Sequence, residues 1–232
     1  MVSQAVILAG GKGERLRPIT DSMPKPMAPV NGYPFLDYLI YSIIQAGIKN
    51  ILILLGYKAE VIADRYMHMK GINIQFSYGD INDETGRRLL NAYYKLENNF
   101  LLMYGDNYWP IELNKMWENY KSMNAKITTT VFSNKKGTGE YGYENNVVVG
   151  SDGLVSEYDK NRNSDKANGI DIGYFLIKKD CIDLNISANI SFEVDILPHF
   201  IAKNQLGAYV TNMQYYYITN TQSLSDFEDA AK

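Results

Sequence analysis

The sequence QAVILAGGKGERL, at residues 4–16, carries the strongest indication of the fold class. Its first six residues, Gln4 to Ala9, form an almost continuous apolar run that ends in Gly10 and Gly11. This pattern predicts a strand buried on both faces and followed by a turn. Strands of this kind belong to parallel sheets whose two faces are covered by helices. We therefore expect an α/β fold in which this is the first strand.

Helices and strands are predicted to alternate through the first half of the chain. Apolar periodicity predicts helices at residues 35–46, 59–69 and 88–96, and strands at residues 50–55, 72–78 and 99–104. This order favours a three-layer, Rossmann-like and mostly parallel sheet. After residue 126 we expect a β-rich half around the sheet, with short segments at 126–133, 146–149, 154–158 and 173–177. One domain, 1–232, is expected, with two halves of different texture at 1–125 and 126–232.

The composition excludes several classes of partner. The 23 Lys and Arg residues against 26 Asp and Glu residues give a net charge of −3, which argues against binding to nucleic acid or to an anionic membrane. Cys181 cannot form an internal disulfide, and the two histidines lack zinc-ligand spacing. Neither a basic leader nor a stretch of membrane-spanning length is found, so we expect a cytoplasmic protein. Self-association into a homo-oligomer is left open.

The loop after the first strand, residues 10–15, is the first candidate site. Open α/β sheets bind ligands beyond the carboxyl ends of their strands. Glycine-rich turns let backbone N–H groups approach phosphate oxygens, and Lys12 and Arg15 add positive charge. The spacing fits neither the dinucleotide fingerprint nor the P-loop, so an ordinary tight turn is an equal alternative for these residues alone.

The longer stretch LAGGKGERLRPITDSMPKPMAPVNGYP, at residues 8–34, resembles the signature of the sugar-1-phosphate nucleotidylyltransferases. The resemblance implies a nucleotide-diphospho-sugar transferase fold, with a nucleotide-binding half at 1–125 and a sugar-phosphate-binding half at 126–232. It also implies a reaction in which a nucleoside triphosphate and a sugar 1-phosphate give a nucleotide-activated sugar and pyrophosphate, for surface polysaccharide precursors. In that family Arg15 would steady the leaving pyrophosphate and Lys25 the reacting α-phosphate. The matching nucleotide-binding positions in this loop are Leu8, Gly10, Gly11 and Gly13.

A carboxylate follows the strand predicted at residues 99–104. Mg²⁺ is often held by one or two carboxylates together with substrate phosphates and water. The resemblance implies that Asp106 is catalytic and anchors Mg²⁺, although Gly105-Asp106 alone would suit a simple turn. The position of the family's second metal aspartate holds Tyr217 here, so the metal would depend on Asp106, Asn220 or additional water.

The base loop at residues 84–89, ETGRRL, resembles the Thr-Gly-Gly-Arg-Leu stretch of glucose-1-phosphate cytidylyltransferases. The comparison implies that Thr85, Gly86 and Arg88 bind the nucleotide. It favours CTP, because a guanidinium donates to the acceptors of cytosine. The PKPMAPV segment also suits guanylyltransferases for mannose or heptose 1-phosphate, so GTP stays open. The two arginines could instead complement acidic neighbours at a helix start.

The resemblance assigns the sugar phosphate to residues of the second half: Tyr141, Gly142, Asp159, Lys160, Asp171 and Glu193. A charged β-turn at 159–162 and an acidic helix start near Glu193 are the structural alternatives. Two further functions stay open. Tyr217 favours a catalytically impaired regulatory protein that binds nucleotide sugars, and a transferase that activates a non-sugar phosphate would share the first half of the chain.

Overall fold

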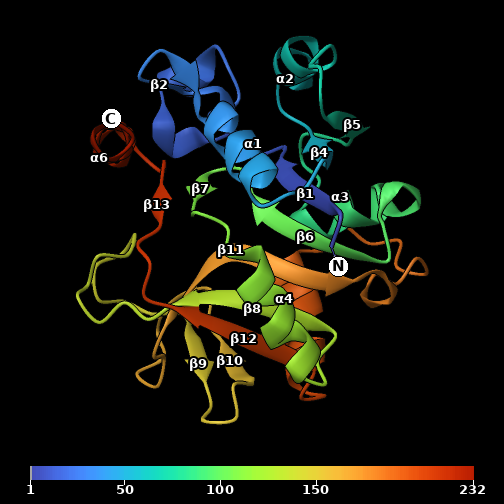
Figure 1. Cartoon of the computed structure of the whole chain (residues 1–232), viewed down its shortest axis with the longest axis vertical. Helices are drawn as coiled ribbons and strands as arrows, with labels where there is room; N and C mark the ends of the chain where they lie inside the picture. The colour runs from blue at the N-terminus through green and yellow to red at the C-terminus, as the bar shows by residue number, and fades with distance from the viewer. Residues whose placement is uncertain (1) are drawn as a thin grey trace.

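One seven-stranded sheet forms the centre of the computed structural model, which describes residues 2–232 (Figure 1). Its strand order is β12-β8-β11-β6-β1-β4-β5. Only β11 runs antiparallel to its neighbours, so the predicted mostly parallel sheet is confirmed. The strands of this sheet are β1 (Gln4–Ala9), β4 (Asn50–Leu55), β5 (Asn73–Tyr78), β6 (Asn99–Tyr104), β8 (Ile127–Phe132), β11 (Ile170–Lys178) and β12 (Leu206–Thr211).

Six α-helices surround the sheet in residues 2–232, namely α1 (Phe35–Gln45), α2 (Ala59–Tyr66), α3 (Thr85–Asn91), α4 (Leu113–Ser122), α5 (Leu197–Ile201) and α6 (Thr221–Ala230). Their buried side chains divide between two apolar cores, one on each face of the sheet. Helices α1, α2, α4 and α6 contribute to one core, and α3 and α5 to the other. Along β1, Ile7 points into the first core and Val6 into the second. This alternation confirms a sheet between two helical layers.

Three short ribbons lie outside the central sheet. They pair β2 (Pro29–Val30) with β3 (Tyr33–Pro34), β7 (Asn107–Tyr108) with β13 (Tyr216–Tyr217), and β9 (Val147–Val149) with β10 (Val155–Tyr158). The β7–β13 ribbon brings the C-terminal part of the chain beside the end of β6 (Figure 1). The remaining short elements are 3₁₀ turns at Glu14–Leu16, Ile19–Asp21, Lys25–Met27, Tyr93–Lys95 and Lys179–Cys181, and a π-helical turn at Phe192–Ile196.

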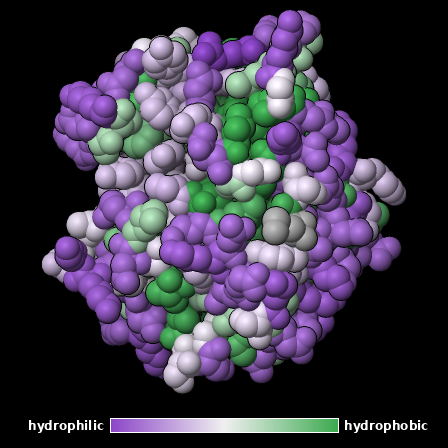
Figure 2. Space-filling view, viewed as in Figure 1, coloured by the Kyte–Doolittle hydropathy of each residue, from purple (hydrophilic) through white to green (hydrophobic). Residues whose placement is uncertain are grey.

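The second half of the chain is arranged differently from the expectation. Strands β8, β11 and β12 complete the central sheet, and only β9 and β10 form a separate ribbon, while α5 and α6 make this half less purely β than predicted. The helix expected at residues 88–96 begins three residues earlier, at Thr85. No helix within residues 2–232 has the length and apolar character needed to cross a bilayer. In the space-filling view, hydrophilic residues cover most of the visible periphery (Figure 2).

Candidate active site

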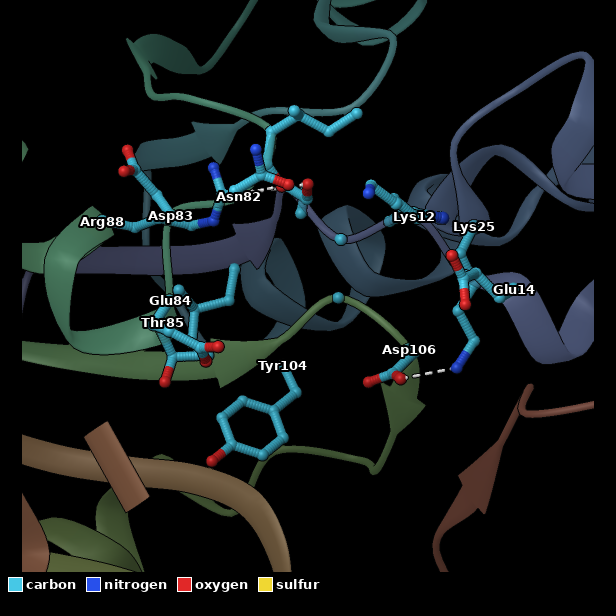
Figure 3. Close-up of a pocket in the computed structure, with 18 of the residues that line it drawn as sticks. Lys12, Glu14, Lys25, Asn82, Asp83, Glu84, Thr85, Arg88, Tyr104 and Asp106 are labelled. Atoms are coloured by element: carbon cyan, nitrogen blue, oxygen red, sulfur yellow. Dashed lines mark hydrogen bonds and ion pairs between the residues drawn. The ribbon is translucent and has the colours of Figure 1, made fainter. Parts of the chain in front are cut away.

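A cavity of about 790 Å³ opens beyond the carboxyl ends of β1 and β6, where ligands of open α/β sheets bind. Its walls come from the loop after β1, the segment at Lys25, the loop before α3 and the end of β6 (Figure 3). Ten residues predicted to act in binding or catalysis line it: Leu8, Gly10, Gly11, Gly13, Arg15, Lys25, Thr85, Arg88, Asp106 and Glu193.

The glycine-rich loop is fixed by its own backbone. Gly13 has a φ of 64°, in the left-handed region that favours glycine. Its carbonyl accepts hydrogen bonds from Leu16 N at 3.0 Å and from Thr20 Oγ1 at 2.9 Å. A methyl group on Gly13 would lie 2.8 Å from Lys25 Cβ. The loop is therefore held against the Lys25 segment while its other side faces the cavity.

Lys25 and Asp106 meet at the floor of the cavity. Lys25 Nζ lies 2.7 Å from Asp106 Oδ2 (Figure 3). The side chains are 11% and 35% exposed, so both can be reached from the cavity. Gly105, before the aspartate, donates its N–H to Leu8 O at 2.9 Å, and a Cβ there would lie 2.6 Å from that oxygen. Glycine at this position lets the end of β6 lie close to β1, which brings Asp106 to the glycine-rich loop.

Arg15 connects the glycine-rich loop to the second half of the chain. Its Nη1 donates to Tyr141 Oη at 2.9 Å and lies 3.4 Å from Glu140 Oε1. The Arg162 guanidinium lies 4.4 Å from the centre of the Tyr141 ring. Burial lowers the pKa of Arg15, but the bond to Tyr141 and the charge of Glu140 outweigh that effect and raise it. Arg15 therefore stays cationic.

The loop before α3 forms the far end of the cavity. It contributes polar Asn82 and acidic Asp83 and Glu84 to the lining, together with the apolar Ile81 (Figure 3). Thr85 reaches the cavity, but Gly86 does not line it. Gly86 packs against the segment before Phe192, where a Cβ would lie 2.8 Å from Ile190 O.

Arg88 lines the cavity from α3, yet its side chain is only 5% exposed. Nη1 donates to Leu55 O at 2.8 Å, and Nη2 donates to Asp80 O at 2.9 Å and Gly10 O at 3.2 Å. These donors point to backbone carbonyls. The predicted role of Arg88 as a reader of the base stays a prediction, without support from these contacts.

Glu193 lies where the two halves of the chain meet. Its Oε1 accepts a hydrogen bond from Tyr104 Oη, and its Oε2 accepts from Thr85 Oγ1 and Ser191 Oγ, each at 2.7 Å. Burial raises the pKa of the Glu193 carboxyl, but these hydrogen bonds outweigh burial and lower it. The carboxylate is therefore ionised at neutral pH and available to a polar ligand in the cavity.

Two other carboxylates predicted to bind the sugar are engaged within the protein. Asp159 caps its own turn and accepts from the backbone N–H groups of residues 161, 163 and 164. Asp171 is buried and accepts from Thr129 Oγ1 at 2.7 Å, Tyr158 Oη at 3.0 Å and Gly173 N at 3.0 Å. Neither side chain lines the cavity, so sugar contacts from them have no geometric support.

The remaining sugar-side residues lie outside the cavity lining. Tyr141 is 41% exposed and reaches the site only through Arg15. Gly142 has a φ of 62°, and its carbonyl accepts from Asn134 Nδ2 at 2.9 Å. Lys160 is exposed on the turn that Asp159 caps. Their roles toward the sugar stay predictions.

Asp106 carries a carboxylate, the type of ligand that binds Mg²⁺, and its role as the metal anchor stays a prediction. Within residues 2–232 no three His, Cys, Asp or Glu residues gather into a metal cluster. Tyr217 pairs with Asn107 across the β7–β13 ribbon, and Ile218 N donates to Asp106 O at 3.0 Å. The tyrosine thus occupies the place beside Asp106 that the resemblance assigns to a second carboxylate. One carboxylate suffices when phosphates and water supply the other oxygen ligands.

Sequence reasoning missed residues that act through others. Glu140 precedes the Tyr141-Gly142 pair. Its Oε1 forms an ion pair with Arg15 and accepts a hydrogen bond from Thr219 Oγ1 at 2.6 Å. Ser191 helps to bind Glu193. The partners of Glu140 lie far away in sequence, so no local pattern could have identified it, whereas Ser191 lies two residues from Glu193.

Comparison with known proteins gives consistent matches. The family model for nucleotidyl transferase matches residues 4–222. A D-glycero-alpha-D-manno-heptose 1-phosphate guanylyltransferase of Aneurinibacillus thermoaerophilus is 30% identical over 211 residues, which cover 88% of each chain. HddC from Yersinia pseudotuberculosis, solved in complex with GMP-PN, is 25% identical with a TM-score of 0.79 and full coverage of both chains.

A further solved structure confirms the fold type predicted from the sequence. A putative glucose-1-phosphate thymidylyltransferase from Bacillus anthracis superimposes with a TM-score of 0.83 over 98% of this chain and 94% of that chain. Its sequence is 19% identical, so this likeness concerns the fold alone. The central sheet is thus that of the nucleotide-diphospho-sugar transferases.

Proposed function

The chain belongs to the nucleotidyl transferase family, and on that premise we propose that it transfers a guanylyl group from GTP to a sugar 1-phosphate. The products are a GDP-sugar and pyrophosphate. The observation that carries the proposal is the cavity itself, where the glycine loop, Lys25, Arg15 and Asp106 converge at one end and an acidic loop closes the other.

The acidic loop supports guanine as the base. The Watson–Crick edge of guanine presents two adjacent donors, N1–H and the N2 amino group, whereas cytosine presents one donor and two acceptors. Exposed Glu84 offers carboxylate acceptors at this end of the cavity. The argument for CTP that used Arg88 as a donor to the base loses support, because the Nη atoms of Arg88 are engaged with backbone carbonyls. The relative named a guanylyltransferase also supports GTP.

The reaction requires a sugar-phosphate oxygen to attack the α-phosphorus while pyrophosphate departs. Catalysis of such transfers depends mainly on positioning and on neutralising charge that moves onto the leaving oxygens. Backbone N–H groups of the glycine loop would hold the phosphates, Lys25 would meet the α-phosphate, and Arg15 would meet the pyrophosphate. Mg²⁺ held by Asp106 would add positive charge at the phosphates.

The sugar would bind on the side of Tyr104 and Glu193. Glu193 is ionised and lines the cavity, so its oxygens can accept hydrogen bonds from sugar hydroxyls. Relatives named for heptose 1-phosphate support a manno-configured sugar as the first substrate to test. A role in surface polysaccharide precursors stays a prediction.

A substrate panel tests the proposal. The purified protein is incubated with Mg²⁺ and each of GTP, CTP, UTP, ATP and dTTP, against mannose, heptose and glucose 1-phosphates and inositol 1-phosphate. Pyrophosphate release and the mass of the product are measured. Fastest turnover with GTP and a mannose or heptose 1-phosphate is expected. Binding of GTP without turnover of any phosphate would favour the regulatory alternative, and turnover of inositol 1-phosphate alone would favour the non-sugar alternative.

A further inference from the structure

The guanidinium of Arg88 lies where three adjacent parallel strands end. Leu55 is the last residue of β4, Gly10 follows β1, and Asp80 lies two residues after β5. Arg88 donates to the carbonyl oxygen of each, at 2.8, 3.2 and 2.9 Å respectively. One side chain on α3 therefore connects three loops. They are the glycine-rich loop at residues 10–16, called the phosphate loop because the proposed function assigns the phosphates to it, and the loops that follow β4 and β5.

Three glycines make room for this guanidinium. A Cβ on Gly10 would lie 2.3 Å from Arg88 Cζ, and one on Gly56 would lie 2.5 Å from Nη1. A Cβ on Gly79 would lie 2.7 Å from Asp83 Oδ2 and 3.2 Å from Arg88 Nη1. Each glycine directly follows one of the three strands. The space is thus shaped for a planar, forked donor, which lysine cannot reproduce with its single ammonium.

The buried charge of Arg88 is balanced from one side. Burial lowers the pKa of the guanidinium, and the nearby carboxylates of Asp83, Asp80 and Glu84 oppose that effect. These acidic residues belong to the loop that forms the far end of the cavity. Arg88 consequently joins the acidic loop and the phosphate loop, the two walls between which a nucleotide would lie.

We propose that Arg88 is a positioning residue that sets the separation of the phosphate loop and the loop at residues 79–84, and does not itself select the base. The inference rests on the proposed function only in taking a nucleoside triphosphate as the ligand. A change at Arg88 then weakens the binding of inorganic tripolyphosphate and of every nucleotide by a similar factor. A change at a base-reading residue would weaken only the binding of nucleotides with one base.

Arg87 offers a matched control on the same helix. Its Nη1 lies 3.4 Å from Ile186 O and 3.5 Å from Ser187 O, on the segment before Phe192, and it does not line the cavity. Arg87→Met and Arg88→Met remove the same charge and the same donors from neighbouring positions. Only the second variant releases the three strand ends.

The test measures dissociation constants of GTP, CTP and inorganic tripolyphosphate by calorimetry for wild type, Arg87→Met, Arg88→Met and Arg88→Lys. Hydrogen exchange of residues 10–16 and 79–86 is followed in the same proteins. We expect Arg88→Met to weaken all three ligands by a similar factor, roughly tenfold to a hundredfold. Exchange should accelerate in both loops, with Arg88→Lys only partly restored and Arg87→Met close to wild type.

Two outcomes would overturn the inference. Loss confined to one nucleotide, with tripolyphosphate binding unchanged, would make Arg88 a base reader. Unchanged binding of all three ligands in a folded Arg88→Met protein would leave it a purely structural residue. If Arg88→Met does not fold, Arg88→Lys decides between the same outcomes. Because binding is measured, the inference can fail even if the wild-type protein passes the substrate panel, and it can hold even if the panel fails.

Discussion

Lys25 Nζ lies 2.7 Å from Asp106 Oδ2, so the lysine predicted for the α-phosphate and the carboxylate predicted for the metal are joined to each other. The two residues are 81 positions apart in sequence and come from different elements. Each neutralises the charge of the other at the floor of the cavity. Removing either one therefore changes the charge at both the proposed phosphate site and the proposed metal site.

Lys25→Ala is expected to lower kcat by roughly a hundredfold to a thousandfold, because it removes a cation that meets charge formed in the transition state. The loss of folding stability should be small, since Lys25 lies in a short 3₁₀ turn fixed by its prolines. Steady-state kinetics and thermal melting measure the two effects. Lys70→Ala, an exposed lysine outside the cavity lining, serves as the control. Near wild-type turnover in a folded Lys25→Ala protein would contradict the proposed contact of Lys25 with the α-phosphate.

Asp106→Asn is expected to abolish most Mg²⁺-dependent turnover, because a neutral amide cannot supply the charge that holds the ion. The amide oxygen can still accept from Lys25, so the local geometry should persist. Binding of Mn²⁺, followed by paramagnetic resonance in the presence of GTP, should weaken in parallel with the rate. Asp64→Asn, an exposed carboxylate outside the cavity lining, is the matched control. An unchanged Mg²⁺ dependence of the rate would show that another group holds the metal.

The strands at the centre of the sheet could be predicted from the sequence. The bounds expected for β1 and β4 agree with the structure, and so does the end of β6 before Asp106. These strands are apolar after their first residue because both of their faces are buried. Strand β12 reads LGAYVT and lies at an edge of the sheet, where its apolar pattern is interrupted, and it was not predicted.

The candidate site was predictable where one local segment builds it, as in the glycine loop. It was not predictable where distant segments decide the surroundings of a side chain. Helix α3 includes Thr85 and Gly86 because Arg87 N donates to Ile190 O at 2.9 Å, a contact across about a hundred residues. Asp171 is enclosed because an irregularity in the β8–β11 pairing directs it toward Thr129 and Tyr158. No sequence pattern reports such partners.

Gly13→Ala is expected to destabilise the protein by about 1–2 kcal/mol, because alanine is unfavourable at a φ of 64°. The new methyl group would also lie 2.8 Å from Lys25 Cβ and 3.0 Å from Thr20 Cγ2. The melting temperature should fall by roughly 2–8 °C for a chain of this size. Gly11→Ala is the control, since no atom lies within 4 Å of a Cβ there. Equal melting temperatures for the two variants would contradict the strain assigned to Gly13.

Asp171 should make stability depend on pH. Burial raises the pKa of its carboxyl from 3.8 to about 6, against the hydrogen bonds from Thr129, Gly173 and Tyr158 and with a further rise from Glu193. Between these pH values the unfolded chain releases the proton that the folded protein keeps, so stability falls as pH rises from about 4 to about 6. The free energy of unfolding falls by about 3 kcal/mol in total, and it stays lower by this amount at higher pH.

Asp171→Asn has no proton to release, so its stability relative to wild type should increase by about 3 kcal/mol between pH 4 and pH 7. Urea unfolding at a series of pH values measures this difference. Glu193→Gln should show the opposite trend, because the pKa of Glu193 is lowered and its contribution is lost as pH falls. Parallel pH curves for wild type and Asp171→Asn would contradict the raised pKa.

Tyr217→Asp is expected to tighten the metal site. Tyr217 pairs with Asn107 next to Asp106, so an aspartate there adds a second carboxylate beside the first. Ligand charge is a main determinant of affinity for divalent cations, and the Mg²⁺ concentration for half-maximal rate should fall about threefold to tenfold. Removing the ring from its contact with Tyr215, at 5.8 Å between centroids, should lower the melting temperature.

Tyr217→Asn loses the same ring without adding charge, so Mg²⁺ titration of the rate and Mn²⁺ binding are compared between the two variants. If both variants need the same Mg²⁺ concentration as each other, Tyr217 does not stand at a metal position, and the single-carboxylate site at Asp106 is complete without it.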